Sequence, residues 1–356
     1  MRKGSLIQYP SGRYYQGYGV IGGLGREAAL LGKRALIVAE TALWDRFAPT
    51  VRESLAVSQI ECRHYAFKGL CCPTQYEAAA AYGRAEGCDL VIGLGGGRAL
   101  DTAKIASDKL GVRAITVPTS AATCAATAWL SVHYREDGTM IGNYWTRYAP
   151  FATFAELQFI LDACPRRYLL AGVIDAMAKY PEITYNIRKG TLYERNAFSM
   201  TAAAVAADMF DTLLEKGLSA ARDDAPLDVK EDVIAYSLNV AGLTSALACG
   251  GRQAAVSHQL YAYVCGRYPE ITARYLHGEI VGASLVYQLR LIDAPDERIN
   301  QLEAFLKAAG APARMADLGL PQDEDTRQRL FDHLRTALPV ESEMEMARLT
   351  AQADWL

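Results

Sequence analysis

The stretch Leu90–Lys104, "LVIGLGGGRALDTAK", decides the fold of the N-terminal half. An apolar run typical of a buried strand leads into three consecutive glycines, and helical spacing begins at Arg98 or Ala99. Glycines at such a turn let backbone N–H groups approach an anion, and the following helix adds the attraction of its dipole. We therefore predict that Gly96 and Gly97 bind the phosphates of a nucleotide. The alternative is a tight strand-to-helix turn that only packs glycine against the sheet.

A second glycine loop, "GYGVIG" at Gly17–Gly22, matches the dinucleotide-binding pattern G-x-G-x-x-G to the letter. It precedes the first convincing strand, and the residues before it, "RYYQ", form at best a short edge strand. The pattern binds a dinucleotide only where a strand leads directly into the glycine turn. We therefore interpret this loop as a glycine-rich lead into a helix.

The N-terminal half alternates strand-like and helix-like segments. Strands are predicted at 34–40, 60–67, 89–95 and 112–118, and helices at 41–56, 74–87 and 98–111. After about Pro165, long stretches rich in Ala, Leu and Met follow, and strand signals nearly vanish. The pattern predicts an α/β domain with a doubly wound parallel sheet at 1–163 and an all-α domain at 164–356.

Composition restricts the class of partner. The 356 residues suffice for two cores, and a net charge of −3 argues against nucleic acid or an anionic membrane as partner. The N-terminus lacks the apolar run of a signal peptide, and no stretch is expected to reach membrane-spanning length. Eight cysteines without a C-x-x-C pair, including the adjacent Cys71 and Cys72, predict reduced thiols. We expect a cytoplasmic protein.

Four segments, taken in order, carry a family resemblance: the glycine turn, "VPTSAATCAATAWLSVHYREDG" at 117–138, "YLLAGVIDAMAK" at 168–179 and "YLHGEIVGAS" at 275–284. Together they resemble the glycerol dehydrogenase branch of the iron-containing (group III) alcohol dehydrogenases. Within it the chain looks most like hydroxycarboxylate dehydrogenase, where a T-C-A-A loop also occurs. The similarity runs from about Tyr9 to Gln288. It implies a dehydroquinate synthase-like fold, with an NAD-binding α/β domain and a helical domain for metal and substrate.

The resemblance implies a set of cofactor-binding residues, namely Glu40, Gly96, Gly97, Arg98, Asp101, Thr119, Ala128, Leu130 and Tyr134. Arg98 replaces a more usual Lys, and Ala128 stands where Ser is common. Glu40 replaces a usual Asp at the end of a predicted strand, where a carboxylate suits the ribose hydroxyls of adenosine. Because it would repel a 2′-phosphate, NAD is favoured over NADP. Without the resemblance, a Glu that ends a strand is more often a helix cap or a surface residue.

The resemblance also implies one divalent metal, held by Asp175, His258 and His277. One carboxylate oxygen and two imidazole nitrogens leave a fourth position open, as a catalytic zinc site requires. Zinc is therefore favoured, with iron or manganese as alternatives. Three residues so scattered along the chain would otherwise be interpreted as structural.

The chain departs from the family pattern at several positions. Ile174 stands where Gly is common, Tyr261 replaces a second His, and a W-Y/F-E pattern becomes Tyr180, Pro181 and Glu182, where we expect the helix to break or kink. Cys124 stands where glycerol dehydrogenases place an Asp that faces polyol hydroxyls. Loss of this carboxylate removes repulsion against an anionic substrate and favours a 2-oxo or 2-hydroxy acid. The alternative is that Cys124 only packs.

The leading hypothesis is a metal-dependent oxidoreductase that transfers a hydride between NAD(H) and a small secondary alcohol or ketone, with a 2-hydroxy or 2-oxo carboxylate as one candidate substrate. Three alternatives remain: a glycerol or other polyol dehydrogenase, a dehydroquinate synthase-like cyclase, and an NAD-binding protein without catalysis. The cyclase needs several cations, and the segments around Asp175 and His258 offer Lys179 and Arg252. His133 is a weak candidate for the general base.

Two further expectations concern assembly and the C-terminus. The resemblance suggests a homo-oligomer. The last segment, "ESEMEMARLTAQADWL", has the pattern of an amphipathic helix, with Met344, Met346, Leu349 and Trp355 on or near one face. We predict that this face packs on the helical domain.

Overall fold

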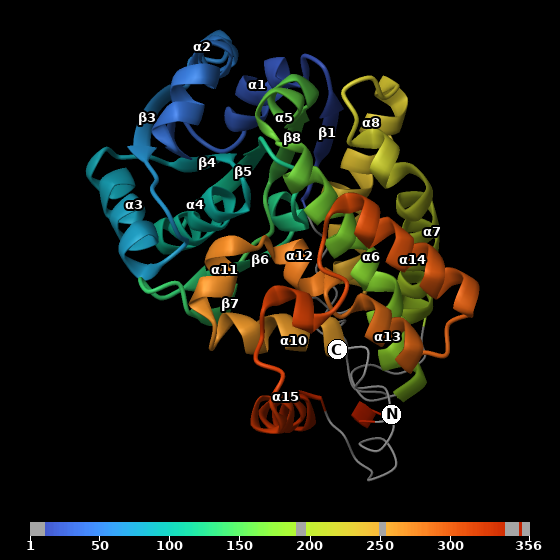
Figure 1. Cartoon of the computed structure of the whole chain (residues 1–356). Coiled ribbons are helices and arrows are strands. Elements are labelled where there is room, and N and C mark those ends of the chain that lie inside the picture. Colours follow the sequence, from blue (N-terminus) through green and yellow to red (C-terminus); the bar gives the residue numbers. More distant parts are fainter. Residues whose placement is uncertain (1–10, 190–196, 249–253, 339–348, 351–356) are drawn as a thin grey trace. The chain divides into compact units, whose positions relative to one another are not determined.

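A computed structural model describes residues 11–189, 197–248, 254–338 and 349–350 of the chain (Figure 1). The chain divides into two compact units, Gln8–Pro165 and a second that begins at Arg166. The first combines strands and helices, and the described part of the second contains helices and turns. The predicted class, a parallel α/β unit followed by a helical one, is confirmed.

The α/β unit contains a six-stranded, all-parallel sheet in the order β1-β8-β5-β4-β2-β3. Its strands are β1 (Tyr14–Gly17), β2 (Arg34–Ala39), β3 (Glu61–Ala66), β4 (Leu90–Gly95), β5 (Arg113–Pro118) and β8 (Ala152–Glu156). The four predicted strands are confirmed as β2 to β5. The sequence interpretation did not include β8, and it allowed only a short edge strand before Gly17, which is the four-residue β1 paired with β8.

Helices cover both faces of this sheet. Ile37 of β2 belongs to a core with Trp44 and Phe47 of α2 (Thr41–Val57), which also includes side chains of α1 (Leu24–Ala28) and α5 (Leu157–Ala163). Val38, the next residue, points to the opposite face and joins a core with α3 (Pro73–Ala85) and α4 (Gly97–Leu110). Two buried faces explain why the central strands are apolar without alternation.

The strand order reverses between β2 and β4. From β2 the chain proceeds outward to β3, whereas from β4 it proceeds to β5 on the other side. Ala39 of β2 pairs with Leu94, and Gly95 pairs with Pro118 of β5, so three strands end at the same edge. In open parallel sheets, ligands bind at the carboxyl ends of the strands where the order reverses. The segments after β2 and β4 occupy this position.

A two-stranded antiparallel sheet interrupts the α/β pattern. It consists of β6 (Leu130–Tyr134) and β7 (Met140–Trp145), preceded by the short helix η2 (Cys124–Ala126). We did not predict these strands, although the sequence contained a hairpin signal in Asp137-Gly138. Gly138 has a φ of +89°, as a tight turn of this kind requires.

The helical unit begins with α6 (Arg166–Lys189), which runs through Pro181. The expected break at Pro181 is therefore wrong. The residues around Pro181, including Ile183, are buried against other helices, and this packing outweighs the cost of a proline in a helix, about 3 kcal/mol. The remaining elements are α7 (Ala197–Ala220), α8 (Leu227–Ala235), the π-helical turn η3 (Tyr236–Val240), α9 (Ala241–Leu247), α10 (Val256–Cys265), α11 (Pro269–Arg274), α12 (His277–Gly282), α13 (Leu285–Leu291), α14 (Asp296–Ala309), η4 (Met315–Leu318) and α15 (Glu324–Ala337).

Helix α7 is apolar. Its 24 residues include a window of mean hydropathy 1.3, so by length and composition it could cross a membrane. The expectation that no stretch reaches this length was therefore wrong. Within the helical unit, the buried residues Ala202, Ala206, Met209 and Leu213 recur every three or four positions and form a packing face, as in the core helix of a globular domain.

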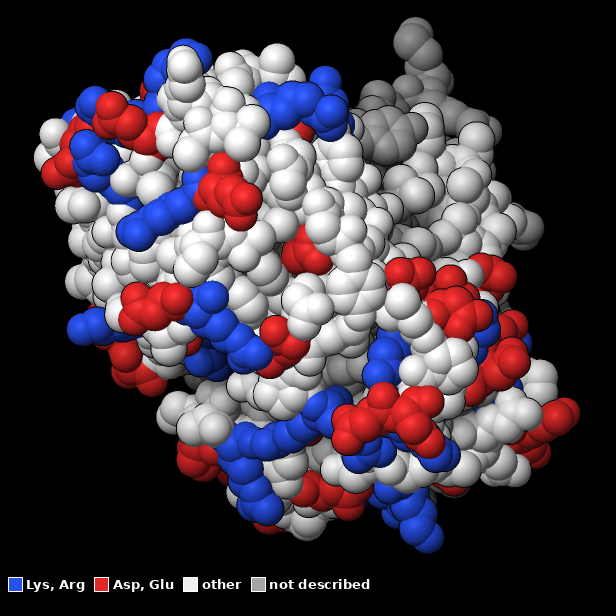
Figure 2. All heavy atoms as spheres, turned by 90° about the horizontal axis from the view of Figure 1, so that it is seen from above, with Lys and Arg blue, Asp and Glu red and all other residues white. Residues whose placement is uncertain are grey.

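Surface charges of both signs are interspersed on the face shown in Figure 2. Within the α/β unit, ion pairs join Arg34 to Glu61 and Arg63 to Glu86. Exposed pairs of this kind contribute about 1 kcal/mol or less each to stability. They suit a protein with a small net charge of −3.

Most of the predicted C-terminal helix lies outside the described residues, including Met344, Met346 and Trp355. Leu349 is described, and it is buried. Its carbonyl accepts a hydrogen bond of 2.8 Å from the hydroxyl of Tyr287 on α13. This residue therefore packs on the helical unit as expected.

Candidate active site

The glycine turn after β4 has the geometry of an anion site. Gly95 has a φ of +148°, which favours glycine, and Gly96 stands at the start of α4 without a side-chain cap. A Cβ added to Gly97 would lie 3.1 Å from Oγ1 of Thr123, so a side chain there would crowd the neighbouring segment. The N–H groups of the first turn of α4 therefore remain available to a phosphate.

In the "GYGVIG" loop, backbone N–H groups are already bound to a carboxylate of the protein. The loop follows β1, a four-residue edge strand, in agreement with the short edge strand that the sequence allowed there. However, the N–H groups of Gly19 and Ile21 donate to the carboxylate of Glu156, at 3.0 and 3.1 Å. Glu156 is 2% exposed. An internal carboxylate thus takes the place that a phosphate would need and would repel it.

The other predicted residues of the glycine turn lie around it. Glu40 directly follows β2, is exposed, and caps α2 without a side-chain hydrogen bond. Arg98 is exposed in the first turn of α4. Thr119 directly follows β5, and its N–H donates to the carbonyl of Gly95 at 3.0 Å. The structure thus brings together residues from the ends of three neighbouring strands.

Asp101 faces the protein interior. Its carboxylate accepts the N–H of Val132 at 3.1 Å and lies 2.9 Å from the ammonium of Lys104. Burial raises the pKa of Asp101, and Lys104 partly offsets this effect. Asp101 therefore anchors β6 in this structure.

The remaining predicted cofactor and substrate residues, Cys124, Ala128, Leu130 and Tyr134, lie on η2, on β6 and between them. All four are partly exposed. The carbonyl of Cys124 accepts the N–H of Ala128 at 3.0 Å, and the N–H of Tyr134 donates to the carbonyl of Cys71 at 2.9 Å. His133, the weak candidate for a general base, lies beside Tyr76, and burial lowers its pKa.

The predicted metal residues converge within the helical unit. Asp175 lies on α6, His258 in the first turn of α10, and His277 at the start of α12. Oδ1 of Asp175 is 3.2 Å from Nε2 of His277 and 3.4 Å from Nε2 of His258. Ligand atoms of all three residues lie within 4.8 Å of one another. One cation could contact the whole set.

Close packing of α12 on α6 positions His277. A Cβ on Gly278 would overlap the carbonyl of Ala171, and one on Gly282 would lie 2.7 Å from Cγ2 of Ile174. The two helices therefore touch backbone to backbone, which brings the first residue of α12 next to Asp175. Ile174, a departure from the family pattern, is part of this contact.

The electrostatics suit a divalent cation. Burial alone would raise the pKa of Asp175, but Lys179, His277 and His258 hold it well below its usual range. Burial likewise would lower the pKa of His258, but Glu182 and Asp175 raise it to about 9. The ionised carboxylate and the two histidine side chains form a donor set that fits zinc or a similar cation, whose binding would displace the added proton of His258.

Glu182 is a site residue whose role we did not predict. It is fully buried, and its carboxylate contacts Nδ1 of His258 at 2.7 Å. It also accepts the backbone N–H groups of His258 and Ala255, at 2.8 and 2.9 Å. When the proton of the neutral ring is held on Nδ1 by this contact, the lone pair of Nε2 faces Asp175, so Glu182 sets the orientation and tautomer of the His258 ring. The signal was its spacing of seven residues from Asp175, on the same face of one helix.

Tyr261, another departure from the family pattern, packs against His277, one of the three predicted metal ligands. Its ring lies edge-on to the ring of His277, with 4.2 Å between centroids. It therefore restricts the orientation of that imidazole. Neither this change nor Ile174 or Pro181 separates Asp175 from the two histidines.

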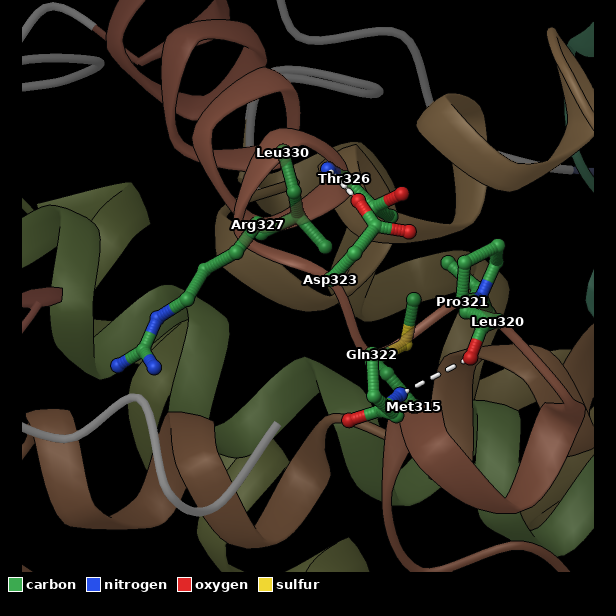
Figure 3. Close-up of a pocket in the computed structure, with 8 residues that line it drawn as sticks. All are labelled: Met315, Leu320, Pro321, Gln322, Asp323, Thr326, Arg327 and Leu330. Atoms are coloured by element: carbon green, nitrogen blue, oxygen red, sulfur yellow. Dashed lines mark hydrogen bonds between the residues drawn. The ribbon is translucent and has the colours of Figure 1, made fainter.

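A small pocket lies elsewhere in the helical unit, between η4 and the start of α15, and encloses about 100 Å³ (Figure 3). Its polar groups are used locally: the carboxylate of Asp323 accepts the N–H of Thr326, and the side-chain amide of Gln322 donates to the carbonyl of Leu320. None of its lining residues belongs to the predicted site. It is a packing feature at the start of α15.

Comparison with known proteins decides the family. The model of the iron-containing alcohol dehydrogenases matches residues 10–153. Glycolaldehyde reductase of Halobacterium salinarum is 30% identical and covers 90% of this chain and 87% of its own. Glycerol dehydrogenase of Thermotoga maritima is 31% identical, with coverages of 88% and 85%. The chain belongs to the iron-containing alcohol dehydrogenase family.

Other matches agree with the branch that the sequence motifs indicated. Hydroxycarboxylate dehydrogenase A of Escherichia coli is 29% identical and covers 90% of this chain and 84% of its own. A probable glycerol dehydrogenase from Sinorhizobium meliloti has a TM-score of 0.83 at 25% identity, and 99% of each chain is covered. As a member of the iron-containing alcohol dehydrogenase family, the chain is a metal-dependent, NAD-linked alcohol oxidoreductase.

Proposed function

We propose that the chain interconverts a small secondary alcohol and its ketone, with NAD(H) on the glycine turn and a divalent cation on Asp175, His258 and His277. The observation that carries the proposal is the convergence of these three side chains from three helices, with their ligand atoms within 4.8 Å of one another. The alcohol loses a hydride to NAD⁺ and a proton to solvent, and the reverse reaction consumes both.

The α/β unit supplies the cofactor site in this proposal. The N–H groups at the start of α4 hold the pyrophosphate, with Arg98 as an adjacent cation. Glu40 accepts hydrogen bonds from the adenosine ribose, and Thr119, Ala128, Leu130 and Tyr134 lie on the nicotinamide side. NAD supplies the redox chemistry, and these residues supply its orientation.

The helical unit supplies the electrophilic site. A cation held there would supply Lewis acidity toward the alcohol or carbonyl oxygen of the substrate. Asp175 supplies the negative charge, Glu182 keeps Nε2 of His258 as a donor, and Tyr261 restricts His277. Two imidazoles and one carboxylate favour zinc over iron, which elemental analysis of the purified protein will decide.

Cofactor preference gives a first prediction. Glu40→Ser is expected to raise the ratio of NADP⁺ to NAD⁺ turnover about tenfold or more, because it removes the charge that would repel a 2′-phosphate. Stability should not change, since the Glu40 side chain caps no backbone group of α2. Steady-state kinetics with both cofactors measure the ratio, with Glu53→Ser on the same helix as the control. An unchanged ratio would remove Glu40 from the cofactor site.

The substrate class follows from Cys124. Cys124 is a thiol at a position where glycerol dehydrogenases have a carboxylate, so this position does not repel an anionic substrate. We therefore propose a 2-hydroxy or 2-oxo acid as substrate. Relatives named for glycerol and for a hydroxycarboxylate both occur, so a polyol is the second candidate.

Cys124→Asp tests this choice. The variant should lose about tenfold or more in kcat/KM for a 2-hydroxy acid through charge repulsion, and its relative activity on glycerol should rise. Cys124→Ser is the control, because it changes the same side chain without adding charge. Equal kcat/KM values for the acid in wild type and Cys124→Asp would exclude contact between this side chain and a substrate carboxylate.

We also propose that the chain forms a homo-oligomer. Light scattering coupled to size-exclusion chromatography measures the mass in solution. A mass of 38.8 kDa, that of one chain, would contradict this proposal.

A further inference from the structure

Lys104 is a buried cation that the family resemblance assigns to no role. It lies on α4, the helix that begins at the glycine turn, and is 1% exposed. Its ammonium donates to three backbone carbonyls, those of Ala125 at 2.8 Å, Ala128 at 3.0 Å and Leu130 at 2.6 Å. An ammonium is rarely buried unless all its donors are used, and here three carbonyls of one segment use them.

Two neighbouring groups complete this anchor. Asp101, one turn earlier on α4, lies 2.9 Å from the ammonium and accepts the N–H of Val132 at 3.1 Å. From β5, the hydroxyl of Thr116 donates to the carbonyl of Ala126 at 2.7 Å. The segment 124–132 is thus held along its length by side chains of α4 and β5.

The same segment touches the glycine turn directly. A Cβ on Gly97 would lie 3.1 Å from Oγ1 of Thr123 and 3.5 Å from Cβ of Ala125. The start of α4 and the segment are therefore packed together, and Lys104 fixes them from inside. The segment carries Cys124, Ala128 and Leu130, which the proposed function places on the nicotinamide and substrate side.

We propose that Lys104 is a positioning residue for hydride transfer, which acts by fixing the segment 124–132 relative to the glycine turn. The inference rests on the proposed function, because it needs NAD on that turn. Lys104 touches neither cofactor nor substrate in this account. Displacement of reacting groups by about 1 Å can cost about 100-fold in rate, so loss of the anchor should reduce turnover more than cofactor binding.

The test compares two lysines of one helix. Lys104→Met removes the ammonium and keeps the length of the side chain, whereas Lys109→Met alters a surface lysine that pairs with Glu77 at 2.6 Å. For each protein, the dissociation constants of ADP-ribose and NADH, kcat, and hydrogen exchange of the backbone are measured. ADP-ribose contains the adenosine and the pyrophosphate but no nicotinamide, so it reports on Glu40 and the glycine turn without the nicotinamide side.

In Lys104→Met, we expect the affinity for ADP-ribose to stay within about threefold, the affinity for NADH to fall, and kcat to fall about 100-fold. Amide exchange should accelerate in the segment 124–132 more than in the sheet. Lys109→Met should match the wild type in every measurement. This combination of results would not arise from a general loss of stability, which would weaken ADP-ribose binding as well.

Unchanged kcat with unchanged exchange in the segment overturns the inference, as does an equal loss of ADP-ribose and NADH binding with faster exchange throughout the α/β unit. If Lys104→Met fails to fold, Lys104→Gln replaces it. Its amide can donate two hydrogen bonds, so smaller effects in the same direction are expected and wild-type values overturn the inference. A wild-type chain that binds neither ADP-ribose nor NADH refutes the proposed cofactor site instead, and the exchange data still decide whether Lys104 anchors the segment.

Discussion

Asp175→Asn is expected to lower kcat/KM by about 1,000-fold or more and to abolish tight metal binding, while the affinity for NADH stays unchanged. The carboxylate carries the only negative charge among the three proposed ligands, and its Oδ1 lies within 3.4 Å of Nε2 of both histidines. A metal ion contributes several kcal/mol of transition-state stabilisation, and each 1.36 kcal/mol corresponds to about tenfold in rate.

The measurements are steady-state kinetics, metal content by elemental analysis, and NADH binding by fluorescence. Asp296→Asn, on a highly exposed aspartate of the same unit, is the matched control and should behave as the wild type. His277→Ala should reproduce the loss. Turnover near the wild-type level in both Asp175→Asn and His277→Ala would remove these residues from the site.

Glu182→Gln is expected to weaken metal binding about 10- to 100-fold, the range found when the partner of a metal-binding histidine is lost. The amide can still accept the N–H groups of Ala255 and His258, but its NH₂ group then faces Nδ1 of His258. Nδ1 of His258 must then accept a hydrogen bond, so the ring proton moves to Nε2. A protonated Nε2 has no lone pair with which to bind the metal.

Competition with a chromophoric chelator measures the metal affinity, and Glu215→Gln, on an exposed glutamate of α7, is the control. Saturating metal should restore much of the turnover of Glu182→Gln, because the three ligands remain in place. A wild-type metal affinity in this variant would show that Glu182 only fills space.

The sequence predicted most of the α/β unit because strands and turns are local signals. The four strands at 34–40, 60–67, 89–95 and 112–118 were found from apolar runs ended by turn residues, and the parallel order followed from their alternation with helices. The preference for the turn at Gly95–Gly97 over the loop at Gly17–Gly22 stays a prediction. Its physical basis was incomplete, since the competing loop is disfavoured by Glu156, a contact between residues 135 positions apart.

Long-range contacts explain what the sequence did not predict. Pro181 suggested a break because local propensity opposes proline in a helix, but burial of the surrounding residues of α6 overrides it. Glu182 and Lys104 were overlooked for a related reason: a buried charge is recognisable only by its partners, which lie 76 and up to 26 residues away in the chain. The ligands Asp175, His258 and His277 came from the family resemblance, since their spacing of up to 102 residues follows no local rule.

The most direct test of the account is turnover as a function of bound metal. The chain is stripped of metal by chelation and titrated with Zn²⁺, and NADH formation from a panel of 2-hydroxy acids, polyols and simple secondary alcohols is followed at each step. We predict no activity in the stripped protein and a linear rise that ends at one metal ion per chain, with Asp175→Asn inactive throughout. Full NADH formation by the metal-free chain would contradict the account.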